Sequence, residues 1–126
     1  MARSIMEAVA EAKAMVPSIS PDEVKAMQGR DDVLIVDVRD APELADGGKV
    51  AGALHVSRGM LEFRADAATP YHNEAFSTDK TVVLYCASGG RSALAGKALL
   101  DLGYANVRNL GAFKDWVAAG GAVEKA

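Results

Sequence analysis

The stretch TVVLYCASGGRSALAGKALLDLG, residues 81–103, decides the fold. Residues 81–85 are apolar or β-branched, a run typical of a buried strand in a parallel sheet. The chain then passes through its only cysteine, Cys86, and a glycine pair into an alanine- and leucine-rich segment. That segment predicts a helix over residues 91–102, which Gly103 stops. A buried strand leading directly into a helix is one unit of an α/β fold.

The segment CASGGRS, residues 86–92, places a thiol at the carboxyl end of the strand, where α/β sheets bind ligands. Ala87 and Ser88 are small, and Gly89 and Gly90 can adopt positive φ, so the chain can curl with its N–H groups facing inward. A ring of amides binds anions, and the following helix adds the positive end of its dipole. We therefore expect an anion-binding loop around Cys86.

Two neighbouring side chains can affect the protonation of the Cys86 thiol. Arg91 either assists the thiolate and an anionic substrate or pairs with a nearby carboxylate at the start of the helix. Ser92 either donates a hydrogen bond to the thiolate or caps the helix. Amides, a helix start and an arginine each lower a cysteine pKa, so we predict a pKa for Cys86 well below about 8.5. The thiolate is the nucleophilic form.

The alternative for Cys86 is an inert core residue, as free cysteines often are. The sequence order around Cys86 favours a reactive thiol instead: a strand, the cysteine, a glycine pair, an arginine and a helix. Groups that stabilise a charge on a partly buried residue are found most often at functional sites.

Outward from this segment, strands and helices alternate along the chain. Helices are expected over residues 3–16, 21–28, 42–47, 91–102 and 113–119, with a helical turn within 57–65. Strands are expected over residues 33–36, 53–56, 81–85 and 106–110, and residues 66–80 are irregular apart from one short helix near Glu74. The alternation predicts an α/β sandwich around a mainly parallel sheet.

Size and charge limit the classes of protein to consider. The chain has 126 residues, of which 50% are hydrophobic, which suits one domain with one continuous core. A net charge of −3 argues against a nucleic-acid partner and against a basic membrane-surface protein. Glu7, Glu11 and Lys13 interrupt the first segment, and no run of about 18 apolar residues occurs, so no secretory signal or membrane span is expected.

A single cysteine excludes an internal disulfide and a zinc site built on several thiolates. His55 and His72 are too far apart in the sequence to form a metal motif, so no metal is expected. A lone thiol fits a reducing compartment, and we expect a cytoplasmic protein.

Four segments together resemble the rhodanese family over residues 19–121. They are IVDVR (35–39) followed by Glu43, GKVAGALH (48–55), YCASGGRS (85–92), and LGYANV (102–107) followed by LG (110–111) and Trp116. Lys49, Ala51 and Ala112 depart from the family pattern, which usually has His, Pro and Gly at these positions.

The resemblance implies a three-layer sandwich, with a central mainly parallel sheet and helices on both faces. It implies a sulfurtransferase in which Cys86 takes a sulfur from thiosulfate or a persulfide donor and passes it to an external thiol or to cyanide. No cofactor and no metal is implied. The implied catalytic residues are Cys86 and Arg91, and the implied substrate-binding residues are Ala87, Ser88, Gly89, Gly90, Ser92 and Arg58.

Two rival functions remain open. A phosphatase or arsenate reductase uses a C-x5-R loop, whereas Cys86 and Arg91 give C-x4-R, which is one residue shorter and suits a single sulfur better. A rhodanese-like module can also act by binding without catalysis, although such modules often lack the cysteine.

The outlying residues have structural interpretations. Asp37 and Arg39 are expected to form ion pairs with neighbouring residues or with Glu43, His55 to be a hydrogen-bonded structural residue, and Trp116 to anchor the last helix. We expect residues 1–17 to form an amphipathic helix that packs on a rhodanese-like domain of residues 18–126, rather than making a dimer contact. A monomer or a weak homodimer is expected.

Overall fold

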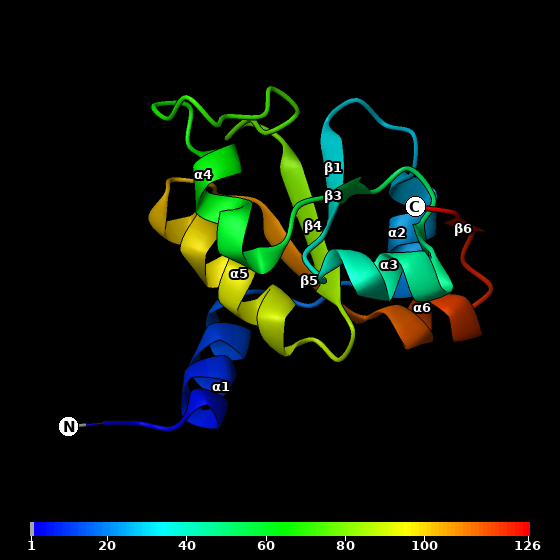
Figure 1. The fold of residues 1–126 in the computed structure, drawn as a ribbon, viewed down its shortest axis with the longest axis horizontal. Helices are drawn as coiled ribbons and strands as arrows, with labels where there is room; N and C mark the ends of the chain where they lie inside the picture. Colours follow the sequence, from blue (N-terminus) through cyan, green and yellow to red (C-terminus); the bar gives the residue numbers. More distant parts are fainter. Residues whose placement is uncertain (1) are drawn as a thin grey trace.

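The computed structural model describes residues 2–126 and is built on a four-stranded parallel sheet (Figure 1). The strand order is β3-β1-β4-β5, and all three pairings are parallel. The strands are β1 (Val33–Asp37), β3 (Leu54–His55), β4 (Thr81–Cys86) and β5 (Val107–Ala112). The mainly parallel sheet expected from the sequence is confirmed.

Helices cover both faces of this sheet (Figure 1), as the sequence predicts for a three-layer sandwich. The helices are α1 (Ile5–Met15), α2 (Pro21–Met27), α3 (Ala41–Gly47), η1 (Arg58–Met60), α4 (Leu61–Ala65), α5 (Gly90–Asp101) and α6 (Phe113–Ala118). No helix within residues 2–126 is both long and apolar enough to cross a bilayer.

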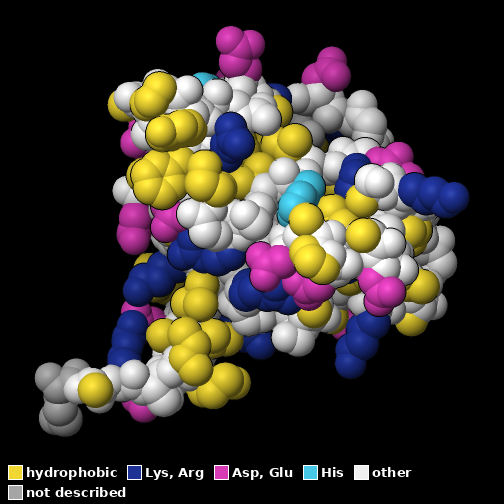
Figure 2. Space-filling view, in the orientation of Figure 1, with side chains coloured by type: hydrophobic (Ala, Val, Ile, Leu, Met, Phe, Trp, Pro, Cys, Tyr) yellow, Lys and Arg dark blue, Asp and Glu magenta, His cyan; other side chains and the backbone are white. Residues whose placement is uncertain are grey.

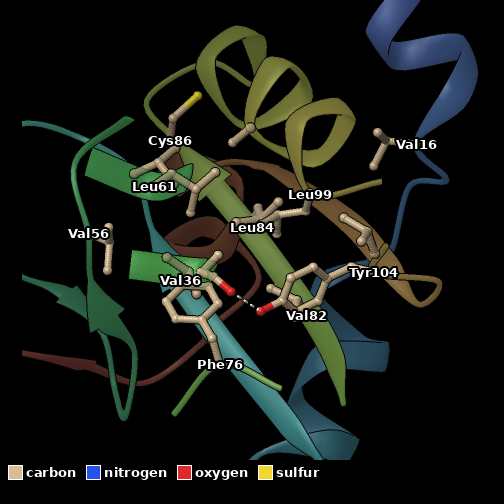
Figure 3. Close-up of a cluster of buried hydrophobic side chains, with 14 residues drawn as sticks. Val16, Val36, Val56, Leu61, Phe76, Val82, Leu84, Cys86, Leu99 and Tyr104 are labelled. Atoms are coloured by element: carbon tan, nitrogen blue, oxygen red, sulfur yellow. Dashed lines mark hydrogen bonds between the residues drawn. The ribbon is translucent and has the colours of Figure 1, made fainter. Parts of the chain in front are cut away.

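The alternation of side chains along β4 divides the core into two clusters. Val82, Leu84 and Cys86 point to the face covered by α4 and α5, where Leu61 and Leu99 complete the packing (Figure 3). Val83 and Tyr85 point to the opposite face.

The second cluster anchors the last helix. Trp116 of α6 is fully buried on the Tyr85 face together with Val24 of α2, and its indole N–H donates to the carbonyl of Ala122 over 2.9 Å. Trp116 therefore anchors α6 as expected.

Local sequence signals set the starts of the first two helices. The side chains of Ser4 and Ser20 accept the N–H groups of Glu7 and Glu23, and both glutamates reach back to form capping boxes. Pro21 fills the first turn of α2, where its missing N–H costs nothing.

One expectation about the elements fails. Residues 66–80 contain turns and no helix near Glu74. The Asn73 side chain accepts the N–H of Ala75 over 2.9 Å, a local bond that competes with helix formation.

A second, antiparallel pair of strands was also not predicted. It joins β2 (Lys49–Val50) to β6 (Val123–Glu124), and Lys49 forms an ion pair with Glu124 at 2.6 Å. Two-residue strands carry no periodicity that a sequence pattern could reveal.

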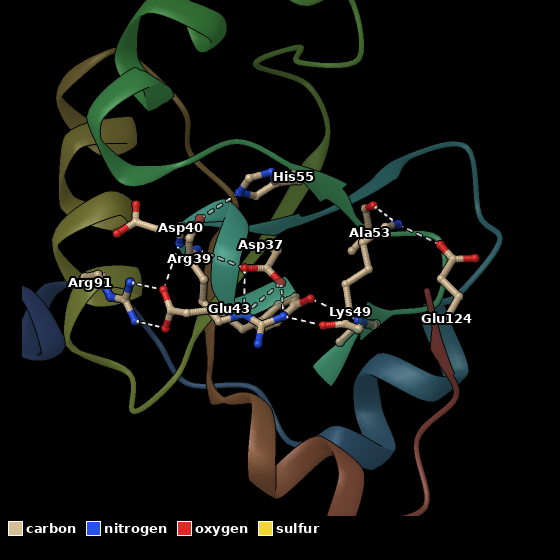
Figure 4. A network of polar contacts seen from close by, with 12 residues as sticks. Asp37, Arg39, Asp40, Glu43, Lys49, Ala53, His55, Arg91 and Glu124 are labelled. Carbon is tan, nitrogen blue, oxygen red and sulfur yellow. Dashed lines mark hydrogen bonds and ion pairs between the residues drawn. The ribbon is translucent and has the colours of Figure 1, made fainter. Parts of the chain in front are cut away.

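Asp37 and Arg39 form a buried ion pair with each other at the end of β1 (Figure 4). The guanidinium donates to Asp37 Oδ2 over 2.6 Å and to the carbonyl of Gly48 over 2.7 Å. It also lies 4.3 Å from the ring centroid of Phe113. The expected structural ion pair is present, but the two residues pair with each other across a single residue rather than with neighbouring residues or Glu43.

We predict that Asp37→Asn destabilises the fold by about 3–5 kcal/mol, because it leaves Arg39 buried without its counter-charge. Chemical denaturation measures the change. Asp32→Asn is the matched control, since it removes the carboxylate of the exposed Arg30–Asp32 pair and should change stability little. Equal losses in the two variants would contradict the structural role of the buried pair.

Candidate active site

Cys86 ends β4 and is fully buried beneath the loop that leads to α5. Ala87 and Ser88 of this loop are exposed. Gly89 has φ +101°, a left-handed conformation that side-chain-bearing residues rarely adopt. Gly90 was expected to share this role but instead begins α5. The positive φ of Gly89 alone turns the chain back over the sulfur.

The sulfur is surrounded by hydrogen-bond donors. The N–H of Gly89 donates to Cys86 Sγ over 3.0 Å, and the Ser92 hydroxyl lies 3.5 Å from Sγ. The same hydroxyl lies 2.7 Å from Asn109 Oδ1 and 3.2 Å from the carbonyl of Gly89, so its one proton has three acceptors. Ser92 therefore joins the sulfur to β5 rather than only capping α5.

Asn109 is the residue of this site that sequence reasoning missed. It is a buried polar residue in the middle of β5, and its amide group also approaches the carbonyl of Gly89 over 3.4 Å. The expected strand over residues 106–110 contains three polar residues, Asn106, Arg108 and Asn109, so the sequence did not single out Asn109.

These contacts act on the pKa of Cys86 in opposite directions. Burial raises the pKa because it disfavours the charged thiolate. Hydrogen bonds from the Ser92 hydroxyl and from the amides of Ser92, Gly89 and Ser88 lower it, and together they outweigh burial, so the pKa lies below its ordinary value. The loop can therefore hold an anionic sulfur in a buried position.

Arg91 forms a bidentate ion pair with Glu43 of α3, with two N–O distances of 2.8 Å (Figure 4). The pair lowers the pKa of Glu43 to about 2, with the hydrogen bonds from Arg91 as the main cause. It also raises the pKa of Arg91, to which the negative charge of the Cys86 thiolate adds. Of the two roles considered for Arg91, the structure shows the carboxylate pair, and the guanidinium remains within the electrostatic reach of the sulfur.

Arg58 is engaged outside the loop. The Arg58 guanidinium pairs with Glu62 one helical turn later, over 2.7 Å. The backbone N–H of Arg58 donates to the backbone carbonyl of Val38. His55 Nε2 lies 2.7 Å from the carbonyl of Arg39, which is the structural hydrogen bond expected for it. The structure thus brings Ser88, Gly89 and Ser92 together around the sulfur. Arg91 lies further away and is bound to Glu43.

Taken together, a buried strand, a cysteine at its carboxyl end and a loop whose Gly89 amide donates to the sulfur define an α/β protein with a candidate cysteine site. Residues 20–119 match the model of the Rhodanese-like domain family. The chain therefore belongs to the rhodanese-like domain family.

Relatives with known sequences or structures agree with this assignment. A sulfurtransferase from Allochromatium vinosum is 35% identical over 80 residues, which cover 64% of this chain and 66% of that protein, just under two thirds of its length. A structure from Rhodopseudomonas palustris, described as a protein of unknown function and possible tyrosine phosphatase, has a TM-score of 0.90 and 39% identity over 98% of this chain and 96% of that one. A human single-domain sulfurtransferase has a TM-score of 0.69 and 29% identity over 82% and 96% of the two chains.

We predict that Ser92→Ala raises the pKa of Cys86, because it removes the hydroxyl contact that favours the thiolate. The pH dependence of alkylation by iodoacetamide should move to higher pH. Ser88→Ala is the matched control, since only the backbone amide of Ser88 acts on the sulfur and the variant retains it. An unchanged profile for Ser92→Ala would show that the hydroxyl does not stabilise the thiolate.

The Glu43–Arg91 pair predicts part of the acid sensitivity of the fold. The pKa of Glu43 is lowered from 4.5 to about 2, so the pair stabilises the folded state above pH 4.5 and loses this effect as the pH falls toward 2. Glu43→Gln should therefore lose less stability than the parent protein over this interval in urea unfolding. Parallel losses in both proteins would contradict the assignment.

Proposed function

We propose that the protein is a sulfurtransferase that carries a sulfane sulfur as a persulfide on Cys86. The observation that carries the proposal is the hydrogen bond from the Gly89 amide to Sγ within a loop that lowers the pKa of Cys86. A persulfide also ends in an anionic sulfur, so the same donors suit the intermediate. Membership of the rhodanese-like family, with relatives named sulfurtransferases, supports the reaction class.

The proposed reaction has two balanced steps. In the first, the Cys86 thiolate attacks the outer sulfur of thiosulfate; a sulfur–sulfur bond forms at Cys86, the bond within thiosulfate breaks, and sulfite leaves with the electron pair. In the second, an acceptor thiolate or cyanide attacks the terminal sulfur, the persulfide bond breaks, and the Cys86 thiolate is regenerated. A persulfide donor would enter the first step in the same way and leave as a thiolate.

Each part of the loop has a role in this scheme. Cys86 is the nucleophile, and the amides of Ser88, Gly89 and Ser92 stabilise its negative charge. Ala87 and Gly90 complete the small-residue wall of the loop, and Arg91, fixed by Glu43, positions the start of α5 and adds a positive field. Arg58 would attract anionic donors from the neighbouring turn.

The acceptor must come from another molecule, because Cys86 is the only cysteine in the chain. Cys86 is also fully buried, so the residues around the sulfur must move before a donor can reach it. We further propose that the protein works in the cytoplasm, where a reducing environment keeps this thiol free.

A phosphatase is the alternative function to consider, because the similar Rhodopseudomonas palustris structure is described as a possible tyrosine phosphatase. In this chain the loop is C-x4-R, one residue shorter than the C-x5-R loop that encloses a tetrahedral oxyanion. Both terminal nitrogens of the Arg91 guanidinium donate to Glu43 rather than pointing toward a bound oxyanion. These features favour transfer of a single sulfur over hydrolysis of a phosphate ester.

We predict that intact-mass analysis after incubation with thiosulfate shows the gain of one sulfur atom. Cyanide or a thiol should reverse the gain, and Cys86→Ser should prevent it. Ser88→Ala, which retains the loop amides, should still accept sulfur.

No gain with thiosulfate or with persulfide donors would contradict the sulfurtransferase proposal and favour a non-catalytic binding module. Turnover of an aryl phosphate that is lost in Cys86→Ser would favour the phosphatase.

A further inference from the structure

Helix α1 lies outside the region that matches the family model, yet it packs against the helix that follows the catalytic loop (Figure 1). A Cβ on Gly90 would lie 3.8 Å from the Val9 side chain, and a Cβ on Gly96 would lie 2.8 Å from that of Val16. Glycine at position 96 lets the end of α1 approach α5 closely, whereas the 3.8 Å at Gly90 is ordinary van der Waals contact. Helix α1 is therefore held against the start of α5, next to the Cys86 loop.

Lys13 is the α1 side chain that reaches this loop. Its Nζ lies 4.0 Å from the point that a Cβ on Gly89 would occupy. Gly89 is the residue whose amide donates to the sulfur over 3.0 Å. The ammonium group of Lys13 therefore lies beside Gly89, the residue whose amide donates to the Cys86 sulfur.

A hollow of about 220 Å³ adjoins this contact and is lined in part by Lys13, Ser18, Asn109 and Gly111. A water molecule takes up about 30 Å³ of liquid, so the hollow can admit a small anion. Asn109, which lines the hollow, also accepts the hydrogen bond of the Ser92 hydroxyl beside the sulfur.

Three arginines near the loop are each paired with a carboxylate, which offsets part of their charge. Arg91 pairs with Glu43, Arg39 with Asp37 and Arg58 with Glu62. Figure 2 shows basic and acidic side chains alternating across the middle of this face, over α5 and α3.

Lys13 differs from these cations. Over residues 2–126, no carboxylate oxygen lies within 4.0 Å of its Nζ. Glu11, on the same helix, is instead bound to Arg3 and Lys97. The charge of Lys13 is therefore the uncompensated one beside Gly89.

We propose that Lys13 is a specificity-determining residue that selects anionic sulfur substrates for Cys86. It draws thiosulfate-like or carboxylate-bearing donors and acceptors to the loop, while the loop itself performs the chemistry. The proposal rests on the proposed function, and it assigns the charge preference of the site to a helix outside the family's matched region.

The test compares an anionic and a neutral reagent at the same sulfur. Iodoacetate and iodoacetamide both alkylate the Cys86 thiolate, so the ratio of their rates cancels the thiolate fraction and reports the local charge. We predict that Lys13→Gln lowers the iodoacetate-to-iodoacetamide ratio about threefold or more, because an unpaired cation beside the loop raises the local concentration of an anionic reagent. Lys13→Arg should restore the ratio, and added salt should reduce the difference.

Lys80→Gln is the matched control, because it removes the same charge next to the opposite end of β4 and should leave the ratio unchanged. An unchanged ratio in Lys13→Gln, an equal fall in Lys80→Gln, or a thiol that reacts with neither reagent would overturn the proposal. The test requires no sulfur transfer, so a protein that forms no persulfide but shows the Lys13 effect would overturn only the proposed function.

Discussion

The left-handed turn at Gly89 is the constraint on which the site depends. With φ at +101°, this residue turns its N–H toward Cys86 Sγ at 3.0 Å and lets α5 begin at the next position. A side chain here would be strained by this backbone conformation, and its Cβ would also stand 3.5 Å from Gly111 Cα. The left-handed backbone at Gly89, rather than a lack of space, is therefore what favours glycine where the loop folds over the sulfur.

Two ion pairs lie near the carboxyl ends of β1 and β4, and one of them reaches the loop (Figure 4). Asp37 and Arg39 fix the end of β1 next to β4, and Glu43 on the following helix holds Arg91 at the start of α5. The Arg39 guanidinium also binds the carbonyl of Gly48, where α3 ends. Glu43 and Arg91, 48 residues apart in the sequence, thus pair beside the loop, and the carboxylate offsets the one positive charge that the loop carries.

The sequence was sufficient to predict the parallel sheet and the position of Cys86 at the end of a strand. An apolar run, a lone cysteine and a glycine pair occur there in one continuous segment. It was insufficient for contacts that depend on tertiary packing. The pairing of Arg91 with Glu43 was left open as one of two roles, since 48 residues separate them. Asn109 escaped notice because its function arises only when β5 lies beside the loop, and the short β2–β6 pair has no sequence period to detect.

The most direct test of the central claim is a titration of the Cys86 thiol by its thiolate absorbance, in folded protein and in protein unfolded by denaturant. Cys86 is the only cysteine, so the signal has one source. The loop amides and Ser92 predict a pKa in the folded state clearly below the value near 8.5 expected for the unfolded chain. A folded-state pKa at or above the unfolded one would mean that burial dominates, that the loop does not stabilise an anionic sulfur, and that Cys86 is a core residue rather than a nucleophile.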